Sequence, residues 1–155
     1  MRGQAEPFTF ALGDTAALVA RLEAVEGRVW VNVQPHVDDE DLPAEGGTPG
    51  LLSGRGPTLP LATWTPGQPA ARRPTPVTIG IQHGAGPRVA HHLRDLGLPV
   101  PPAWEVVQDH PRRGLVVEVP DGSPLADVLG WLLAATGALC PVPFVWWHAT
   151  LHRPR

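Results

Sequence analysis

The sequence predicts an α+β fold, with a mostly antiparallel, or mixed, sheet of about six to seven strands covered by about three helices. Two observations predict the sheet. Short runs alternate apolar and polar residues, as half-buried strands do, and brief turns join neighbouring runs. A third observation predicts the helices, because longer segments repeat apolar residues at helical spacing. The expected order is β-α-β-β-β-α-β-β-α-β.

Length and composition predict one domain spanning residues 1–155. A chain of 155 residues can bury a core, and a hydrophobic fraction of 43% is ordinary for a globular protein. The 20 Pro and 17 Gly residues are expected mainly in loops. Two of these loops are long, at residues 35–58 and 65–76, and the first begins with the acidic run 38–41.

Residue usage indicates a source and argues against one class of partner. All 12 basic residues are Arg, and the chain has no Lys and no Tyr, whose codons are rich in A and T. This bias predicts a bacterium with a high-GC genome, so the excess of Arg is not evidence for nucleic acid. The formal net charge of −3 argues further against a protein that binds phosphate backbones.

The sequence predicts a cytoplasmic protein without a membrane partner. Cys140 is the lone cysteine, which excludes an internal disulfide and fits a reducing compartment. The N-terminal residues lack the apolar stretch of a secretory signal. Residues 128–147 carry no formal charge, but Pro141 and Pro143 interrupt any helix there before it is long enough to cross a bilayer.

The first part of the chain is predicted to run strand, helix, strand. Residues 7–12 form the first strand, and a helix follows from an N-cap at Asp14 to a C-cap at Gly27. Residues 28–34 alternate strictly, so a strand there places its three Val side chains on one face. The opposite face of that strand carries Trp30, Asn32 and Gln34.

The rest of the chain is predicted to add five strands and two helices. These are strands at 59–64 and 77–82, a helix from Pro87 to Gly97, strands at 104–108 and 115–119, a helix capped by Ser123, and a strand at 144–152. We expect the helices to bury their apolar stripes on one face of the sheet, which leaves the other face mixed and partly polar.

A Gly-rich turn between a predicted strand and helix is the best local signal of a ligand site. It contains the candidate residues Gln82, His83, Gly84, Gly86 and Arg88. Such glycines let a backbone approach a ligand closely, and the N-terminus of a helix attracts anions. The plainer interpretation is a tight turn whose glycines only permit a positive φ.

This turn resembles the acyl-CoA-binding segment of the GCN5-related acetyltransferases, in which a strand runs into a Gly-rich loop that opens a helix. The resemblance rests on Gln82, Gly84, Gly86 and Arg88. It implies acyl-CoA as a cofactor, with the loop amides holding its pyrophosphate. The chain departs from the family in having Arg88 where Gly or Ala is usual, in the extra strand at 104–108, and in lacking the Tyr that often serves as the acid.

The turn of the predicted hairpin is a second candidate ligand site. His110, Arg112 and Arg113 lie there together, and adjacent Arg side chains can hold a phosphate or a carboxylate. The alternative is a solvated loop that keeps the hairpin soluble.

The sequence predicts neither a metal site nor a set of catalytic residues. His36 stands beside the acidic run, and His91 and His92 are adjacent on a helix, but no H-E-x-x-H pattern is present. Cys140 lies in an apolar region, where a thiol stays protonated. The chain is therefore interpreted as a binding protein rather than an enzyme.

The last predicted strand carries rings on the second face of the sheet. Trp146, with Phe144, His148 and His152, is expected to form a stripe near Trp30. Such a stripe is either a binding patch, a dimer interface, or a surface covered by the loop at 42–58. Trp147, Val145 and Leu151 are expected in the core.

The leading hypothesis is a non-enzymatic binding module that self-associates or takes a protein partner through this face, with candidate interface residues Trp30, Trp146 and His148. The alternative is an acyl-CoA-binding, acetyltransferase-like protein that uses the turn at 82–88.

Overall fold

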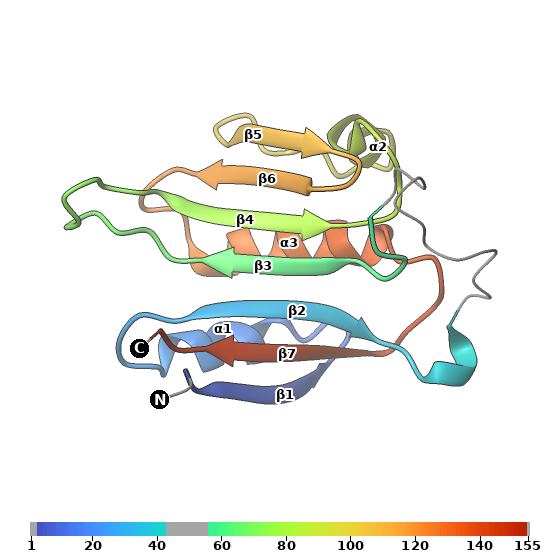
Figure 1. Cartoon of the computed structure of the whole chain (residues 1–155), viewed down its shortest axis with the longest axis horizontal. Helices are drawn as coiled ribbons and strands as arrows, with labels where there is room; N and C mark the ends of the chain where they lie inside the picture. Colours follow the sequence, from blue (N-terminus) through green and yellow to red (C-terminus); the bar gives the residue numbers. More distant parts are fainter. Residues whose placement is uncertain (1–2, 43–55, 155) are drawn as a thin grey trace.

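One antiparallel sheet organises the computed structural model. In the residues that the structure describes, 3–42 and 56–154, the sheet has seven strands and three α-helices pack against it (Figure 1). The strand order is β1-β7-β2-β3-β4-β6-β5, and every neighbouring pair is antiparallel. The predicted α+β class and the predicted order of elements are confirmed.

The elements follow one another along the chain as β1 (Ala5–Ala11), α1 (Thr15–Glu23), β2 (Trp30–His36), β3 (Leu61–Thr65), β4 (Val77–Gln82), α2 (Val89–Asp95), β5 (Glu105–His110), β6 (Gly114–Val119), α3 (Leu125–Ala138) and β7 (Trp146–His152). A short 3-10 helix spans Asp39–Asp41 within the acidic run.

The last strand lies between the first two strands. β7 pairs along its whole length with β1 on one side and with β2 on the other. The chain therefore passes from β1 through α1 to β2 across β7, and α3 later carries it from β6 past three strands to β7 (Figure 1). The C-terminal strand is therefore an interior strand of the sheet.

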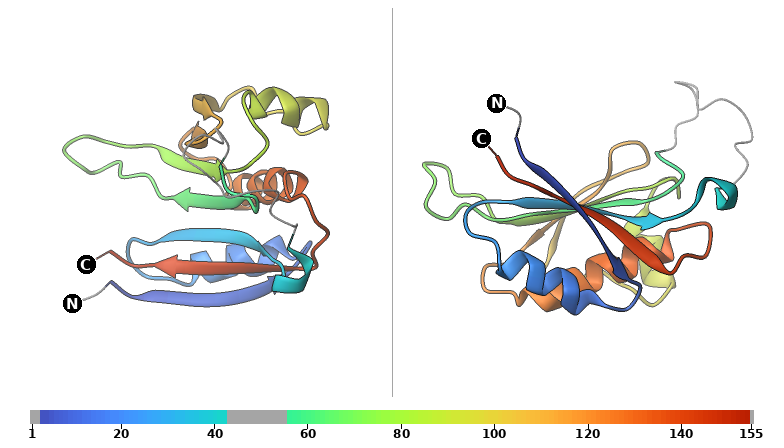
Figure 2. Two further views of the ribbon diagram at one scale, coloured as in Figure 1. Left: turned by 45° about the vertical axis from the view of Figure 1, so that its right-hand side comes forward. Right: turned by 90° about the horizontal axis from the view of Figure 1, so that it is seen from below.

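The core lies between the helices and one face of the sheet. Figure 2 shows α1, α2 and α3 on the same side of the sheet. Alternate strand residues point toward them and are buried, namely Val31, Val33, Ala62, Ile79, Ile81, Leu115, Val117, Trp147, Ala149 and Leu151. Leu18 of α1 and Leu129 of α3 are fully buried against this layer, and each contributes about 1.5–3 kcal/mol by leaving water.

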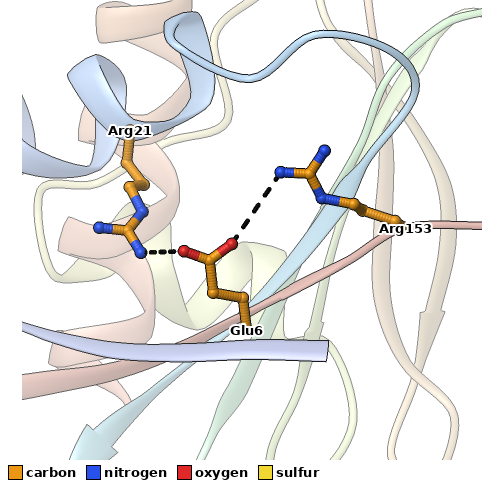
Figure 3. A network of polar contacts seen from close by, with 3 residues as sticks. All are labelled: Glu6, Arg21 and Arg153. Carbon is orange, nitrogen blue, oxygen red and sulfur yellow. Dashed lines mark hydrogen bonds and ion pairs between the residues drawn. The ribbon is translucent and has the colours of Figure 1, made fainter. Parts of the chain in front are cut away.

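Ion pairs tie α1 to the edge of the sheet (Figure 3). The Glu6 carboxylate on β1 accepts a hydrogen bond from the Arg21 guanidinium on α1, and its second oxygen lies 4.0 Å from the guanidinium of Arg153. The Arg21 guanidinium also lies 4.7 Å from the centre of the Phe8 ring. All three charged side chains are exposed to solvent, so each pair contributes at most about 1 kcal/mol to stability.

Both edges of the sheet carry features that discourage pairing with another strand. Leu12 N donates to Val145 O and Arg153 N donates to Gln4 O, so the even-numbered residues of β1 direct their backbone polar groups toward β7. Pro7 therefore stands where its N–H would otherwise face the open edge, and it has none to offer. At the other edge, the register of β5 shifts between Val106 and Gln108.

Several helix boundaries differ from the sequence predictions. Asp14 is confirmed as the N-cap of α1 because its side chain accepts from Ala17 N at 3.2 Å, but α1 ends at Glu23, before Gly27. α2 begins at Val89 rather than at Pro87. Ser123 does not cap α3, since its hydroxyl donates to Pro120 O at 2.8 Å.

The region before β7 also differs from its prediction. Val145, which comes just before β7, is 68% exposed rather than part of the core. The Phe144 ring packs edge-on against the Trp147 ring, with the ring centres 4.7 Å apart, instead of joining the stripe on the second face.

The two long connections have structure of their own where they are described. The loop at 65–76 is closed by a bridge between Gln68 and Thr75, and most of the residues between them are exposed. In the connection at 35–58, residues 43–55 lie outside the described residues, and so does most of the segment predicted as a cover for the second face.

The helices in the described part of the chain are all too short or too polar to cross a membrane. α3, which opens the uncharged stretch at 128–147, has 14 residues.

Candidate functional site

The face of the sheet opposite the helices is the candidate functional site. In the described residues no helix packs on this face (Figure 2). The alternate side chains that point to it from β2, β3, β4 and β7 are all half-buried or exposed. They are Trp30, Asn32, Gln34, His36, Leu61, Thr63, Thr65, Thr78, Gln82, Trp146, His148, Thr150 and His152. We call this surface the open face.

The open face carries rings and neutral hydrogen-bonding groups. From β2, β3, β4 and β7 it presents Thr, His, Asn and Gln together with two Trp, and these strands place no Asp, Glu or Arg there. Glu118 and Glu105 lie farther along the face, on β6 and β5. The surface can therefore exchange hydrogen bonds and stack rings, but it lacks the charge that attracts phosphate backbones.

A chain of contacts fixes the middle of this face across three strands. Thr63 Oγ1 donates to Asn32 Oδ1 at 2.8 Å, so the Asn32 amide nitrogen is free to donate to His152 Nε2, 3.2 Å away. The Trp30 ring stacks on the His152 ring with centres 5.0 Å apart. These side chains are held in place before any partner arrives, which lowers the entropy cost of binding.

A second group of rings lies at the other end of the same strands. Trp146 is 48% exposed and sits opposite His36 on β2 and Ala11 on β1. The rings of His36 and His148 lie 6.4 Å apart. The structure thus places the three predicted interface residues on one face, with Trp30 and Trp146 at opposite ends of neighbouring strands.

A hollow of about 220 Å³ lies on the open face over β3, β4 and β6. Its floor is at Gly80, which stands between Thr63 on β3 and Val116 on β6 and has no side chain to fill the space. Gln82 and Arg113 both line the hollow, so the structure brings together two candidate residues that the sequence assigned to different sites.

The other residues of the Gly-rich turn face away from this hollow. His83 is 1% exposed, and its Nδ1 accepts from Ala85 N at 3.1 Å. Its Nε2 has no hydrogen-bond partner within the described residues. Burial lowers the pKa of His83 below its ordinary value of 6.5, against a smaller opposing effect of the Asp109 carboxylate.

The local structure explains why glycines stand in the turn. Gly86 has a φ of +87°, which other residues rarely adopt. A Cβ on Gly84 would lie 3.0 Å from the carbonyl oxygen of Pro57, so the turn passes close to another part of the chain. Arg88 is the N-cap of α2 with a φ of 58° and makes no side-chain cap bond.

The first amides of α2 already have an anionic partner. The two carboxylate oxygens of Asp109 on β5 accept from Val89 N and Ala90 N, each at 3.1 Å. Reasoning from the sequence missed this contact, because Asp109 lies 20 residues along the chain from Val89. A pyrophosphate at this helix end would have to displace the carboxylate.

The strands beside the turn pair continuously and leave no gap between them. β4 pairs with β6 without interruption from Val77 to Ile81, and β5 lies beyond β6. No splayed strand pair thus provides room for a pantetheine arm in this part of the described structure. The acyl-CoA hypothesis stays a prediction without a geometric observation in its favour.

The hairpin turn is held by its own side chains. His110 Nδ1 accepts from Arg112 N at 3.0 Å and from Arg113 N at 3.1 Å. Gln108 Nε2 donates to Arg113 O at 3.0 Å and to Gly114 O at 3.2 Å. Both backbone polar groups of Arg113 are therefore fixed. A Cβ on Gly114 would lie 2.4 Å from Ile81 O, so this glycine lets the turn approach β4 and brings Arg113 to the hollow.

Within residues 3–42 and 56–154, no group of three or more His, Cys, Asp or Glu is placed to hold a metal ion. The Cys140 thiol is partly buried and lies 3.2 Å from the carbonyl oxygen of Val142.

Comparisons with protein families, curated proteins and solved structures find no match for this chain.

Proposed function

We propose that this protein is a non-enzymatic binding module that pairs with a second copy of itself through the open face. The observation that carries the proposal is the aromatic part of that face on β1, β7, β2 and β3, which has exposed rings and no Asp, Glu or Arg. Each copy has a formal net charge of −3, and the aromatic part of the open face adds no charge to the overall repulsion between two copies.

Face-to-face pairing is favoured over pairing of edges. The Pro7 position on β1 and the shifted register of β5 both discourage the addition of a strand at an edge. The open face instead resembles one half of a sandwich of two sheets, in which rings and small polar side chains interdigitate. The hydrogen bonds from Thr63 through Asn32 to His152 already hold these side chains in place, so they need not rearrange when a partner binds.

The size of the aromatic part predicts a reversible association. Three strands of seven residues and one of five, spaced about 4.8 Å apart at roughly 3.4 Å per residue, cover about 420 Å². Two copies then bury about 850 Å² together, which is the class of weak and transient interfaces. A concentration-dependent dimer is expected rather than a permanent one.

The test is sedimentation velocity over a range of protein concentrations. We expect the wild-type chain to shift from monomer toward dimer as concentration rises. Trp146→Glu places a charge on each side of the interface and should raise the dimer Kd by roughly tenfold or more.

Leu96→Glu is the matched control, since Leu96 follows α2 on the helix side and is 50% exposed, close to the 48% of Trp146. This control should associate like the wild type. A wild-type chain that stays monomeric at all concentrations, or a Leu96→Glu variant as impaired as Trp146→Glu, would overturn the proposal.

A further inference from the structure

We infer that the hollow over Gly80 binds a small molecule that carries a carboxylate beside a compact apolar group. This inference does not rest on the proposed dimer, because the floor of the hollow is on β4 and the exposed rings lie on β7 and β2, although both surfaces include β3.

Gly80 is the first reason, because the fold does not require a glycine there. Its φ is not positive, and a Cβ built on it would lie 3.5 Å from Leu115 O, which is an ordinary contact. A glycine inside a strand weakens the strand and often marks a place where a ligand approaches the backbone. Here β4 is an interior strand, and the missing side chain opens the hollow.

The charge of the lining is the second reason. Arg113 is the charged residue among those that line the hollow, and Glu118 and Glu105 on the same face line no part of it. A guanidinium offers two parallel N–H donors that match a carboxylate. The His110 and Gln108 side chains hold the Arg113 backbone from both sides, so the point from which the Arg113 side chain extends is fixed beside the hollow.

The remaining lining sets the character of the ligand. The Gln82 amide adds a donor beside Arg113, and Leu61 and Val116 supply apolar walls on either side of Gly80. The Thr63 and Thr78 hydroxyls donate to Asn32 Oδ1 and Pro76 O, so they offer lone pairs to a ligand rather than donors. The volume of about 220 Å³ is smaller than that of pockets for drug-sized molecules. A short aliphatic or single-ring carboxylic acid fits these limits.

The experiment is a titration of the full chain followed by amide NMR spectra, with sodium acetate, isovalerate and benzoate as the added carboxylates. Benzamide is the uncharged counterpart of benzoate, and inorganic phosphate is an anion without an apolar group. We expect isovalerate or benzoate to shift the amides of Gly80, Gln82 and Arg113, with clearly smaller shifts from benzamide and phosphate.

Two variants test the assignment. Arg113→Gln removes the guanidinium and should weaken carboxylate binding about tenfold or more. Gly80→Val fills the floor with a residue that suits a strand, and it should abolish binding while keeping the fold. Arg72→Gln, on the exposed 65–76 loop, is the matched control and should bind as the wild type does.

The outcomes distinguish this site from the proposed dimer. The Trp146→Glu chain should bind benzoate as well as the wild type does, even where it no longer associates. Absence of shifts at the hollow with all three carboxylates would overturn the inference. So would equal binding by the wild type and Arg113→Gln, or retention of binding by a folded Gly80→Val chain.

Discussion

His83 is a buried base whose surroundings disfavour its charged form. Its ring is 1% exposed, and accepting a bond from Ala85 N at Nδ1 leaves the proton on Nε2, which has no partner within the described residues. The sequence placed His83 with Gln82 in one ligand site. His83 comes directly after Gln82, the last residue of β4, and the two lie on opposite sides of the chain, so Gln82 lines the hollow while the His83 ring is buried.

Acid should destabilise the protein through His83. The pKa of His83 is lowered by folding below the ordinary 6.5, so as pH falls through this value the unfolded chain binds the proton first. The stability present above about pH 6.5 is therefore lost below it, with a slope of at most about 1.4 kcal/mol per pH unit from this group.

Denaturant unfolding of the wild type and of His83→Asn at several pH values from neutral to mildly acidic measures this effect. The Asn side-chain oxygen can still accept from Ala85 N, but it does not titrate. The variant should have the flatter dependence of unfolding free energy on pH. An equal dependence in the two proteins would show that His83 does not contribute.

The short helix α2 depends on a distant strand for its start. With seven residues, α2 is too short to be stable alone, and its first amides are satisfied by Asp109 on β5. Local sequence predicted Pro87 as the first helical residue, whereas the helix begins two residues later at Val89. Such a cap cannot be read from nearby residues, because tertiary contact supplies it.

Asp109→Ala should destabilise the protein by about 1–2 kcal/mol, since two amide groups lose their acceptor. Denaturant unfolding gives this difference. Asp95→Ala is the control, because the Asp95 side chain is exposed and pairs with the exposed His91 at 3.5 Å. That change should stay within about 0.5 kcal/mol of the wild type. Equal effects of the two substitutions would contradict the capping role of Asp109.

At the scale of the whole molecule, local patterns predicted the elements and the two faces of the sheet. Alternation in residues 28–34 separated the buried Val side chains from Trp30 and Asn32, as the structure confirms. Strand order was not predictable from the same patterns, because α1 and α3 carry the chain across other strands. The hollow was missed for that reason. The residues that line the hollow come from β3, β4, β6 and the turn before β6. In the sequence, Gly80 looks like any other residue of the strand.

The sheet thus has its apolar face covered by helices, and its ring-bearing face, uncharged on β1, β7, β2 and β3, is left open in the described structure. The proposed pairing through the open face is tested most directly by a dilution series of the wild-type chain followed by amide NMR spectra. Shifts that depend on concentration should map to residues 30–36 and 146–152, while α1 and α3 stay unchanged. Spectra that do not change on dilution, or changes confined to the helices or to β5, would contradict the open face as the surface through which the protein pairs.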